Sequence, residues 1–196
     1  MALIPTSWVD LTDTQLADQA AHETAQPNEA FAELYRRHVN RVYRYLLART
    51  GSVQDAQDIT SQTFLAALEG ISSYRKEAGF AAWLLGIARR KLADHYRYHY
   101  GQINALSLDD AETSAQADPL PEDRVSEHLQ LERVLGVLRT LPPDRAEALT
   151  LHIFGELTPA EIGQVMGKSS AAVRMLIHRA LSDLRIRLGQ KESTYE

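Results

Sequence analysis

Cysteine is absent from the 196 residues, so the chain has no disulfide framework and no thiolate metal site. No run of about 18 apolar residues is present that could cross a membrane, and the N-terminus lacks the basic and apolar segments of a secretion signal. No segment alternates apolar and polar residues, rich in β-branched side chains, over the length of a strand. We therefore expect a helical chain in the cytoplasm, without membrane insertion.

Charge is distributed in blocks, although the net charge is only -5 at pH 7. Residues 1–30 hold five acidic residues and no Lys or Arg, and residues 101–130 hold seven acidic residues and one Arg. In contrast, residues 71–100 carry six Lys or Arg against two acids, and residues 168–191 carry six against one. Local fields therefore matter more than the net charge, and the two basic blocks are candidates for contact with nucleic acid.

The first hundred residues are predicted to form four helices separated by recognisable caps. The expected helices cover residues 13–23, 28–50, 52–70 and 80–98, with a polar, basic loop over residues 71–79. Asn28 and Ser52 are typical N-cap residues, and Gly51 is a typical helix stop. The side chains expected to face inward, at helical spacing, are Phe31, Leu34, Tyr35, Val42, Tyr45, Leu46, Ile59, Thr63, Phe64, Ala67, Leu68, Trp83, Leu84, Ile87, Ala88 and Leu92.

An acidic segment, residues 101–122, interrupts this pattern. It contains two prolines and has no apolar stripe, so we expect a flexible linker rather than a packed element. Four more helices are expected after it, over residues 125–138, 146–153, 159–165 and 170–188. The predicted fold class is therefore all-α, with two small helical domains, residues 1–100 (including an N-terminal extension, 1–27) and residues 123–196.

The most specific local pattern is a helix-turn-helix over residues 158–188. Thr158 and Glu161 are spaced as a capping box around a short helix, and a tight turn at Gly167 precedes a long helix capped by Ser169 or Ser170. The face of the long helix expected to pack inward holds Val173, Ile177, Ala180, Leu181, Leu184 and Leu188. The face expected to be exposed holds Ala171, Arg174, Met175, His178, Ser182 and Arg185.

Such a helix enters the major groove of DNA in helix-turn-helix proteins. Arg174, near its N-terminus, is suited to reading base edges, while Lys168 and Arg179 are suited to holding phosphates. The other interpretation of this segment is a surface helix of an ordinary bundle whose charges are simply solvated.

A basic, aromatic segment lies at residues 74–100. Cations can follow a phosphate backbone while aromatic rings stack on bases that have left the duplex, so a protein that melts DNA needs both together. The other interpretation places the aromatic residues in the core, which we favour for Trp83. His95 and His99 lie four apart on the helix but have no third ligand in register. We therefore expect no metal site and no cofactor, and we see no arrangement of catalytic residues.

Six motifs, in order, resemble a known family: FAELYRRH at residues 31–38, DAQDI at 55–59 with TFL at 63–65, FAAWLLGIAR at 80–89, LPPDR at 141–145, LTPAEI at 157–162, and VR with IHRA between residues 173 and 180. Together they are similar to the extracytoplasmic-function (ECF) sigma factors of bacterial RNA polymerase. The resemblance covers roughly residues 28–100 and 123–188.

The resemblance implies a factor that binds core RNA polymerase through its clamp and flap, recognises the minus-ten and minus-thirty-five promoter elements and promotes DNA melting. It also implies an anti-sigma factor as a partner. The residues it assigns to the minus-ten element are Arg75, Lys76, Phe80, Arg89, Arg90, Lys91 and Arg97. Those assigned to the minus-thirty-five element are Lys168, Ser169, Ser170, Arg174, His178 and Arg179. Those assigned to polymerase are Asp55, Asp58, Gln62, Thr63 and Phe64.

Four positions depart from the family pattern. Arg90 stands where an Asn is common, Ser61 and Gln62 replace a Gln-Glu pair, and Leu176 stands where a basic residue is common. Two other functions remain as alternatives: a dimeric helix-turn-helix regulator that acts without polymerase, and a helical protein–protein adaptor whose basic faces only keep it in solution.

Overall fold

The computed structural model describes residues 8–22, 28–76, 79–105 and 134–192, and the elements found in them are helices. The first module contains the short 3-10 helix η1 (Trp8–Asp10), the helices α1 (Asp13–His22), α2 (Glu29–Thr50) and α3 (Val53–Gly70), the 3-10 helix η2 (Ile71–Ser73) and α4 (Phe80–Ala105). The second contains a helical stretch over residues 134–139, then α6 (Pro143–Ile153), α7 (Pro159–Met166) and α8 (Ser170–Glu192).

The helix boundaries follow local capping chemistry. The side chain of Asn28 accepts a hydrogen bond from the amide of Phe31, and the side chain of Ser52 accepts one from the amide of Asp55. Gly51 ends α2 in the left-handed conformation, with φ 72°, which glycine adopts without steric cost. These two N-caps and this stop are confirmed as predicted from the sequence.

Two features of the first module differ from the sequence prediction. The expected loop after α3 begins with the one-turn helix η2, which Ser73 closes by donating its hydroxyl to the carbonyl of Gly70. The helix predicted to end near Tyr98 continues through Gly101 to Ala105, with no proline to interrupt it. Residues 101–105 of the predicted linker therefore belong to α4, and the rest of that segment lies outside the described residues.

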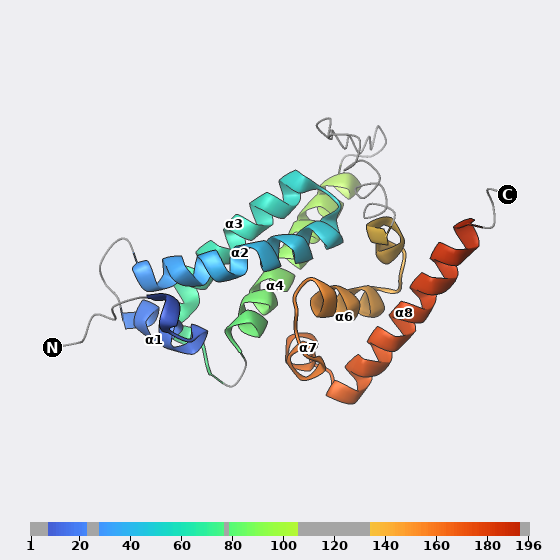
Figure 1. Ribbon diagram of the computed structural model, residues 1–196. Helices are drawn as coiled ribbons and strands as arrows, with labels where there is room; N and C mark the ends of the chain where they lie inside the picture. The colour runs from blue at the N-terminus through green and yellow to red at the C-terminus, as the bar shows by residue number, and fades with distance from the viewer. Residues whose placement is uncertain (1–7, 23–27, 77–78, 106–133, 193–196) are drawn as a thin grey trace, which may run out of the picture.

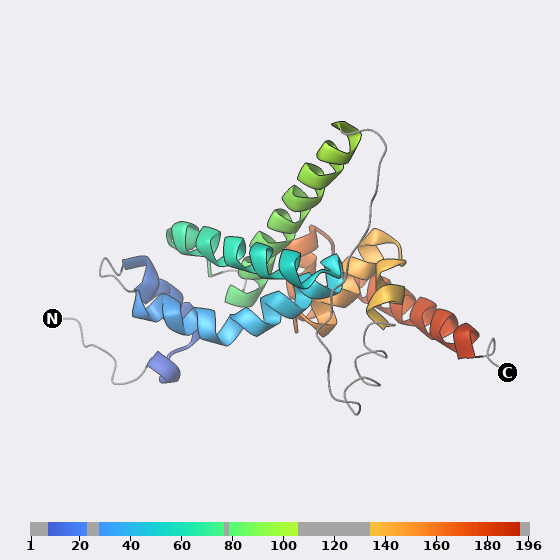
Figure 2. The ribbon, with the colours of Figure 1, turned by 90° about the horizontal axis from the view of Figure 1, so that it is seen from above.

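The hydrophobic core is continuous between the two modules. In the first module it includes Leu34, Tyr45, Leu46, Ile59, Leu84 and Leu85, and in the second Leu138, Leu149, Leu151, Ile162 and Val173. Figures 1 and 2 show α6 and α7 beside α4 and α2, with α8 on the far side of the second module. The two modules therefore lie against each other, although the predicted linker suggested separate ones.

Most of the predicted inward faces are confirmed. Two side chains expected inside are exposed: Tyr35 on α2, at 44%, and Leu181 on α8, at 40%. Tyr35 rests on the edge of Phe64, whose ring takes the buried position, and Leu181 lies one residue beyond the buried Ala180. Both lie at the margin of an apolar stripe, where helical periodicity alone does not decide the direction.

Candidate nucleic-acid interface

The basic side chains of α4 form an exposed edge. Arg89, Arg90 and Arg97 are exposed, and Lys91 is half-buried. Arg97 forms an ion pair with Asp94 one turn away. Arg89 instead points toward the second module, where its Nη1 lies 3.5 Å from the carbonyl oxygen of Val165. Arg90 and Lys91 belong to no ion pair recorded for the described residues, and they are the cations of α4 most open to a phosphate backbone.

The loop before α4 adds two more predicted cations. Arg75 and Lys76 are both exposed. Lys76 Nζ lies 2.5 Å from Asp18 Oδ2 of α1, so the N-terminal acidic segment neutralises one of the basic side chains assigned to DNA. Since this ion pair is on the surface, it contributes little to stability and can be exchanged for a phosphate.

An aromatic cluster supports the start of α4. Phe80, Tyr74 and Trp83 lie with ring centroids 5.4–5.6 Å apart, and His38 of α2 packs 5.3 Å from Phe80. Phe80 is only 2% exposed, so its ring cannot stack on a base in this conformation, although the resemblance assigned it to DNA. Trp83 is half-buried and packs against the core, as the sequence analysis favoured. The cluster fixes the loop and the first turn of α4 relative to each other.

The helix-turn-helix is formed by α7 and α8. Thr158 and Glu161 make the predicted capping box, each side chain bonding to the backbone of the other. Gly167 ends α7 with φ 67°. The backbone after this turn passes close to α7, so that a Cβ on Gly163 would lie 2.5 Å from the carbonyl oxygen of Lys168. The hydroxyl of Ser169 accepts a hydrogen bond from the amide of Ala172, which identifies Ser169 as the cap of α8.

The exposed face of α8 is the predicted one: Ala171, Arg174, Met175, His178, Ser182 and Arg185 are all exposed, as is Arg179. Arg174 Nη1 donates to the hydroxyl of Ser170 at 2.9 Å, which holds the guanidinium at the N-terminal end of the helix. Lys168 forms an ion pair of 3.0 Å with Asp144 of α6. Of the six residues assigned to the minus-thirty-five element, four therefore lie at the N-terminal end of α8: Lys168, Ser169, Ser170 and Arg174. His178 and Arg179 lie about two turns further along the helix.

The residues assigned to polymerase lie on α3 but do not share one exposed surface. Asp58 and Gln62 are exposed, and Asp55 is half-buried, with its Oδ2 3.7 Å from His95 Nε2. Thr63 and Phe64 are buried.

Exposed apolar side chains near these α3 residues were missed by the sequence analysis. They are Val53 and Leu65, at 56% and 58%, and Tyr35 of α2. Large apolar side chains that are exposed close to one another, as here near Asp58, are typical of a surface that binds a protein partner. Leu65 stands two residues after the buried Thr63, so it lies on the opposite, exposed side of α3.

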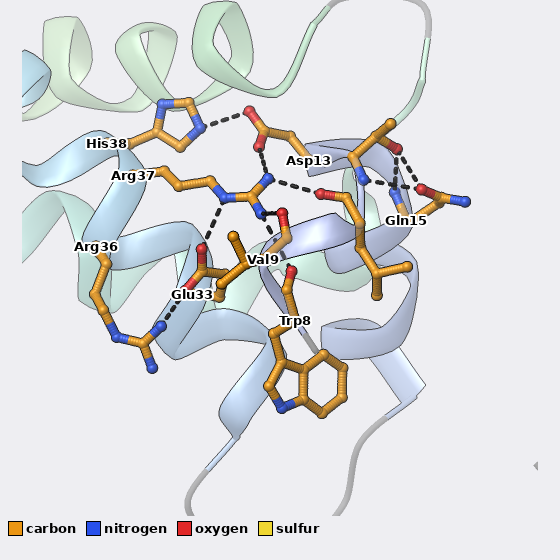
Figure 3. Close-up of polar contacts among 10 residues, drawn as sticks. Trp8, Val9, Asp13, Gln15, Glu33, Arg36, Arg37 and His38 are labelled. Atoms are coloured by element: carbon orange, nitrogen blue, oxygen red, sulfur yellow. Dashed lines mark hydrogen bonds and ion pairs between the residues drawn. The ribbon is translucent and has the colours of Figure 1, made fainter. Parts of the chain in front are cut away.

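The N-terminal segment is fixed to α2 by the guanidinium of Arg37 (Figure 3). Arg37 donates to the carbonyl oxygens of Trp8, Val9 and Leu11 at 2.8–3.1 Å. It also forms ion pairs with Asp13, at 3.0 Å, and with Glu33, at 2.9 Å.

The neighbouring His38 completes this network. Its Nε2 lies 2.7 Å from the second carboxylate oxygen of Asp13, and this hydrogen bond lowers the pKa of Asp13 below its ordinary value. Because His38 also packs on Phe80, the network connects the N-terminal segment to the aromatic cluster.

No group of three His, Cys, Asp or Glu side chains in the described part of the chain is arranged to hold a metal ion. None of the described helices is long and apolar enough to span a bilayer.

Two family models match the chain in the order of its modules. The model for Sigma-70 region 2 matches residues 34–100, and the model for Sigma-70 region 4 matches residues 131–184. The chain belongs to the sigma-70 family. It is a sigma factor of the extracytoplasmic-function type, a transcription initiation factor with region 2 in the first module and region 4 in the second.

Individual relatives agree with this assignment. The chain is 36% identical to the ECF RNA polymerase sigma factor BldN of Streptomyces coelicolor over 83% of its length, an alignment that covers 62% of BldN. It is 33% identical to the RNA polymerase sigma factor CarQ of Myxococcus xanthus, over 84% of this chain and 92% of CarQ. Its structure is similar to that of CnrH in complex with the cytosolic domain of CnrY, with a TM-score of 0.68, 26% identity and coverage of 91% and 97% of the two chains.

Proposed function

We propose that this sigma factor recognises a promoter through two separate surfaces, one on each module, and carries core RNA polymerase to it. The basic edge of α4 and the loop before it would meet the minus-ten element and its separated strand. The N-terminal half of α8 would read the minus-thirty-five element in the major groove. This function would be exerted in the cytoplasm, where bacterial RNA polymerase works.

The observation that carries this proposal is the presence of two different kinds of DNA-binding surface in one chain. The α8 surface presents Arg174 and His178 from the N-terminal half of a helix, which suits an intact major groove. The α4 surface combines Arg90 and Lys91 with the exposed ring of Tyr98, which suits phosphates next to unstacked bases. A dimeric helix-turn-helix regulator is not favoured, because it gives no reason for the first module to match region 2.

The polymerase contact is proposed for the outer face of α3. Exposed Asp58 and Gln62 stand beside the exposed apolar Leu65, and this mixture of charge and apolar area is suited to a protein partner. The clamp of polymerase is the proposed site for this face, and the flap is proposed for the second module. We also propose an anti-sigma factor as a partner, as the family resemblance implies. CnrH, whose structure is similar, was likewise solved in complex with another protein, the cytosolic domain of CnrY.

Reconstitution with core RNA polymerase tests the proposal. The purified chain is mixed with polymerase that lacks its own sigma factor, and transcript starts are mapped on fragments of genomic DNA. We expect defined starts that share an upstream sequence. A chain that fails to associate with polymerase would contradict the proposed function.

The two DNA surfaces can be separated with matched variants in the same assay. Arg174→Ala should lower transcription about 5- to 150-fold, because one bidentate base contact contributes about 1–3 kcal/mol. Arg185→Ala is the control, since Arg185 is exposed on the same helix but lies about four turns from its N-terminus. Arg90→Ala combined with Lys91→Ala should instead reduce DNA opening, measured by permanganate reactivity of unpaired thymines, while duplex binding at the upstream element persists.

A further inference from the structure

A buried histidine of α2 lies between the N-terminal segment and the loop before α4. His38 is 4% exposed, and its Nε2 lies 2.7 Å from Asp13 Oδ2 of α1 (Figure 3). The same ring packs against Phe80, with the two ring centroids 5.3 Å apart. One imidazole therefore contacts α1 through a hydrogen bond and the first residue of α4 through its ring.

The hydrogen bond to Asp13 fixes the orientation of this ring. Arg37 Nη1 lies 3.0 Å from the other oxygen of the Asp13 carboxylate, so the carboxylate is held from both sides. The hydrogen bond from His38 is the largest cause of the lowered pKa of Asp13, so the carboxylate is ionised at neutral pH and can only accept. Nε2 of His38 therefore carries the hydrogen, and the ring is oriented in the way that a carboxylate orients a metal-binding histidine.

Stability alone does not explain an imidazole at this position. Its Nδ1 is buried and has no hydrogen-bond partner among the described residues. The free energy lost by leaving a buried polar atom unpaired is similar in size to the free energy gained from one hydrogen bond to a charged group. An apolar side chain would fill the same space without this loss. The property that the imidazole adds is therefore a fixed direction for its ring.

Phe80 connects the oriented ring to the loop before α4. Its side chain is 2% exposed and meets the ring of Tyr74 edge-on, with 5.6 Å between the centroids and 84° between the planes. Trp83 packs against both rings, with centroids 5.4 Å and 5.5 Å away. Tyr74 directly precedes Arg75 and Lys76, the two exposed cations of the loop. Because closely packed side chains transmit displacement, a shift of Phe80 moves the backbone from which these cations extend.

We propose that His38 is a positioning residue for promoter opening: anchored by Asp13, it fixes Phe80 and so aims the loop cations Arg75 and Lys76 at the minus-ten element. The proposal rests on the proposed function in one respect, the assignment of this loop to the minus-ten element. The buried contact from Asp13 to the loop is independent of that assignment.

A second contact between α1 and the loop supplies a matched control. Asp18 Oδ2 pairs with Lys76 Nζ, but the two side chains are 48% and 58% exposed, so the pair holds the loop weakly. Asp18→Asn removes a carboxylate of the same helix and leaves the buried network intact. Comparison with this variant therefore separates the buried positioning contact from the charge of α1.

The absence of cysteine allows the loop to be labelled at one site. A nitroxide on Ser72→Cys, an exposed position two residues before Tyr74, reports local mobility by electron paramagnetic resonance of the full-length free chain. His38→Ala removes both the ring and the hydrogen bond. His38→Phe keeps a ring beside Phe80 and removes only the bond to Asp13, so it also keeps the test valid if His38→Ala folds poorly.

The expected result is equal line widths in the wild type and in Asp18→Asn, and narrower lines from a more mobile label in both His38 variants. DNA opening with core RNA polymerase, measured by permanganate reactivity of unpaired thymines, should fall about tenfold in the His38 variants. That is the lower end of the loss caused by removing a partner that orients a metal ligand. Association with polymerase and binding to the upstream duplex should stay close to wild type, because α3 and α8 contribute no residue to this network.

Three outcomes would overturn the proposal. Unchanged line widths in both His38 variants would show that the imidazole does not hold the loop. A more mobile loop with undiminished opening would show that the position of the loop does not limit opening. Parallel loss of opening and of polymerase association would show that His38 only maintains the fold. A wild-type chain that directs no transcription contradicts the proposed function and with it the role in opening, while the line widths still report whether His38 holds the loop.

Discussion

At the scale of single residues, the guanidinium of Arg37 holds the N-terminal segment on α2. It reaches three backbone carbonyls and two carboxylates, a pattern that the five N–H donors of arginine can satisfy and the single ammonium of lysine cannot. We predict that Arg37→Lys lowers the free energy of unfolding by about 2 kcal/mol. Faster hydrogen exchange across residues 8–22, measured by mass spectrometry, would accompany this loss.

The neighbouring Arg36→Lys serves as the control for this prediction. Arg36 has a largely exposed side chain and forms an ion pair with Glu33 alone. Its replacement should leave both exchange and unfolding close to those of the wild type. Equal effects of the two substitutions would mean that the region responds to net charge and not to the hydrogen bonds of Arg37.

The hydrogen bond between Asp13 and His38 predicts an acid-sensitive contribution to stability. Because the folded pKa of Asp13 lies below its ordinary value of 3.8, the ionised carboxylate stabilises the folded chain above about pH 4, and this contribution is lost as pH falls through the lowered value. Asp13→Asn should therefore be less stable than the wild type at neutral pH, and the difference should shrink below about pH 4.

Urea unfolding of the two proteins at a series of pH values measures this difference. His38→Gln is the informative companion, because removing the partner should return the pKa of Asp13 toward its ordinary value. The acid-dependent loss should then begin at a higher pH than in the wild type. A constant difference between wild type and Asp13→Asn across the whole series would show that the carboxylate charge does not contribute.

At the scale of elements, the turn between α7 and α8 depends on a glycine. A Cβ at residue 163 would lie 2.5 Å from the carbonyl oxygen of Lys168, and the amide of Lys168 already donates to the carbonyl of Gly163. Since this neighbour is backbone, it cannot move without shifting the start of α8. We predict that Gly163→Ala destabilises the chain by about 1–3 kcal/mol and weakens DNA binding by α8.

Gly86→Ala is the matched control for that prediction. Gly86 lies inside α4, and a Cβ there would meet nothing within 4 Å. Replacing it should stabilise the helix by about 0.5–1 kcal/mol, because alanine loses less backbone entropy on folding. Thermal unfolding of the two variants should therefore move in opposite directions. Movement in the same direction would mean that the close approach at residue 163 does not limit the turn.

Local sequence signals predicted most of these elements because each boundary has a local chemical cause. Asn28, Ser52 and Thr158 accept hydrogen bonds from amides three residues later, so their effect is visible within a few positions of sequence. The predicted inward directions of Tyr35 and Leu181 were wrong, because a neighbouring side chain occupies the buried position beside each of them. The exposure of Leu65 was missed for the same reason.

At the scale of the whole molecule, the contact between the modules could not be predicted from the sequence. The phenol of Tyr45 on α2 donates a hydrogen bond to Glu147 of α6, which lies 102 positions away, and neither residue differs locally from an ordinary helix residue. The acidic composition of the segment between the modules suggested that the two modules are independent. Composition indicates whether a segment itself packs, and it does not indicate whether the modules at its two ends contact each other. Periodicity identified each module, and only the folded structure reveals that arginines of α2 and α4 face Glu147 and Glu156 of the second module.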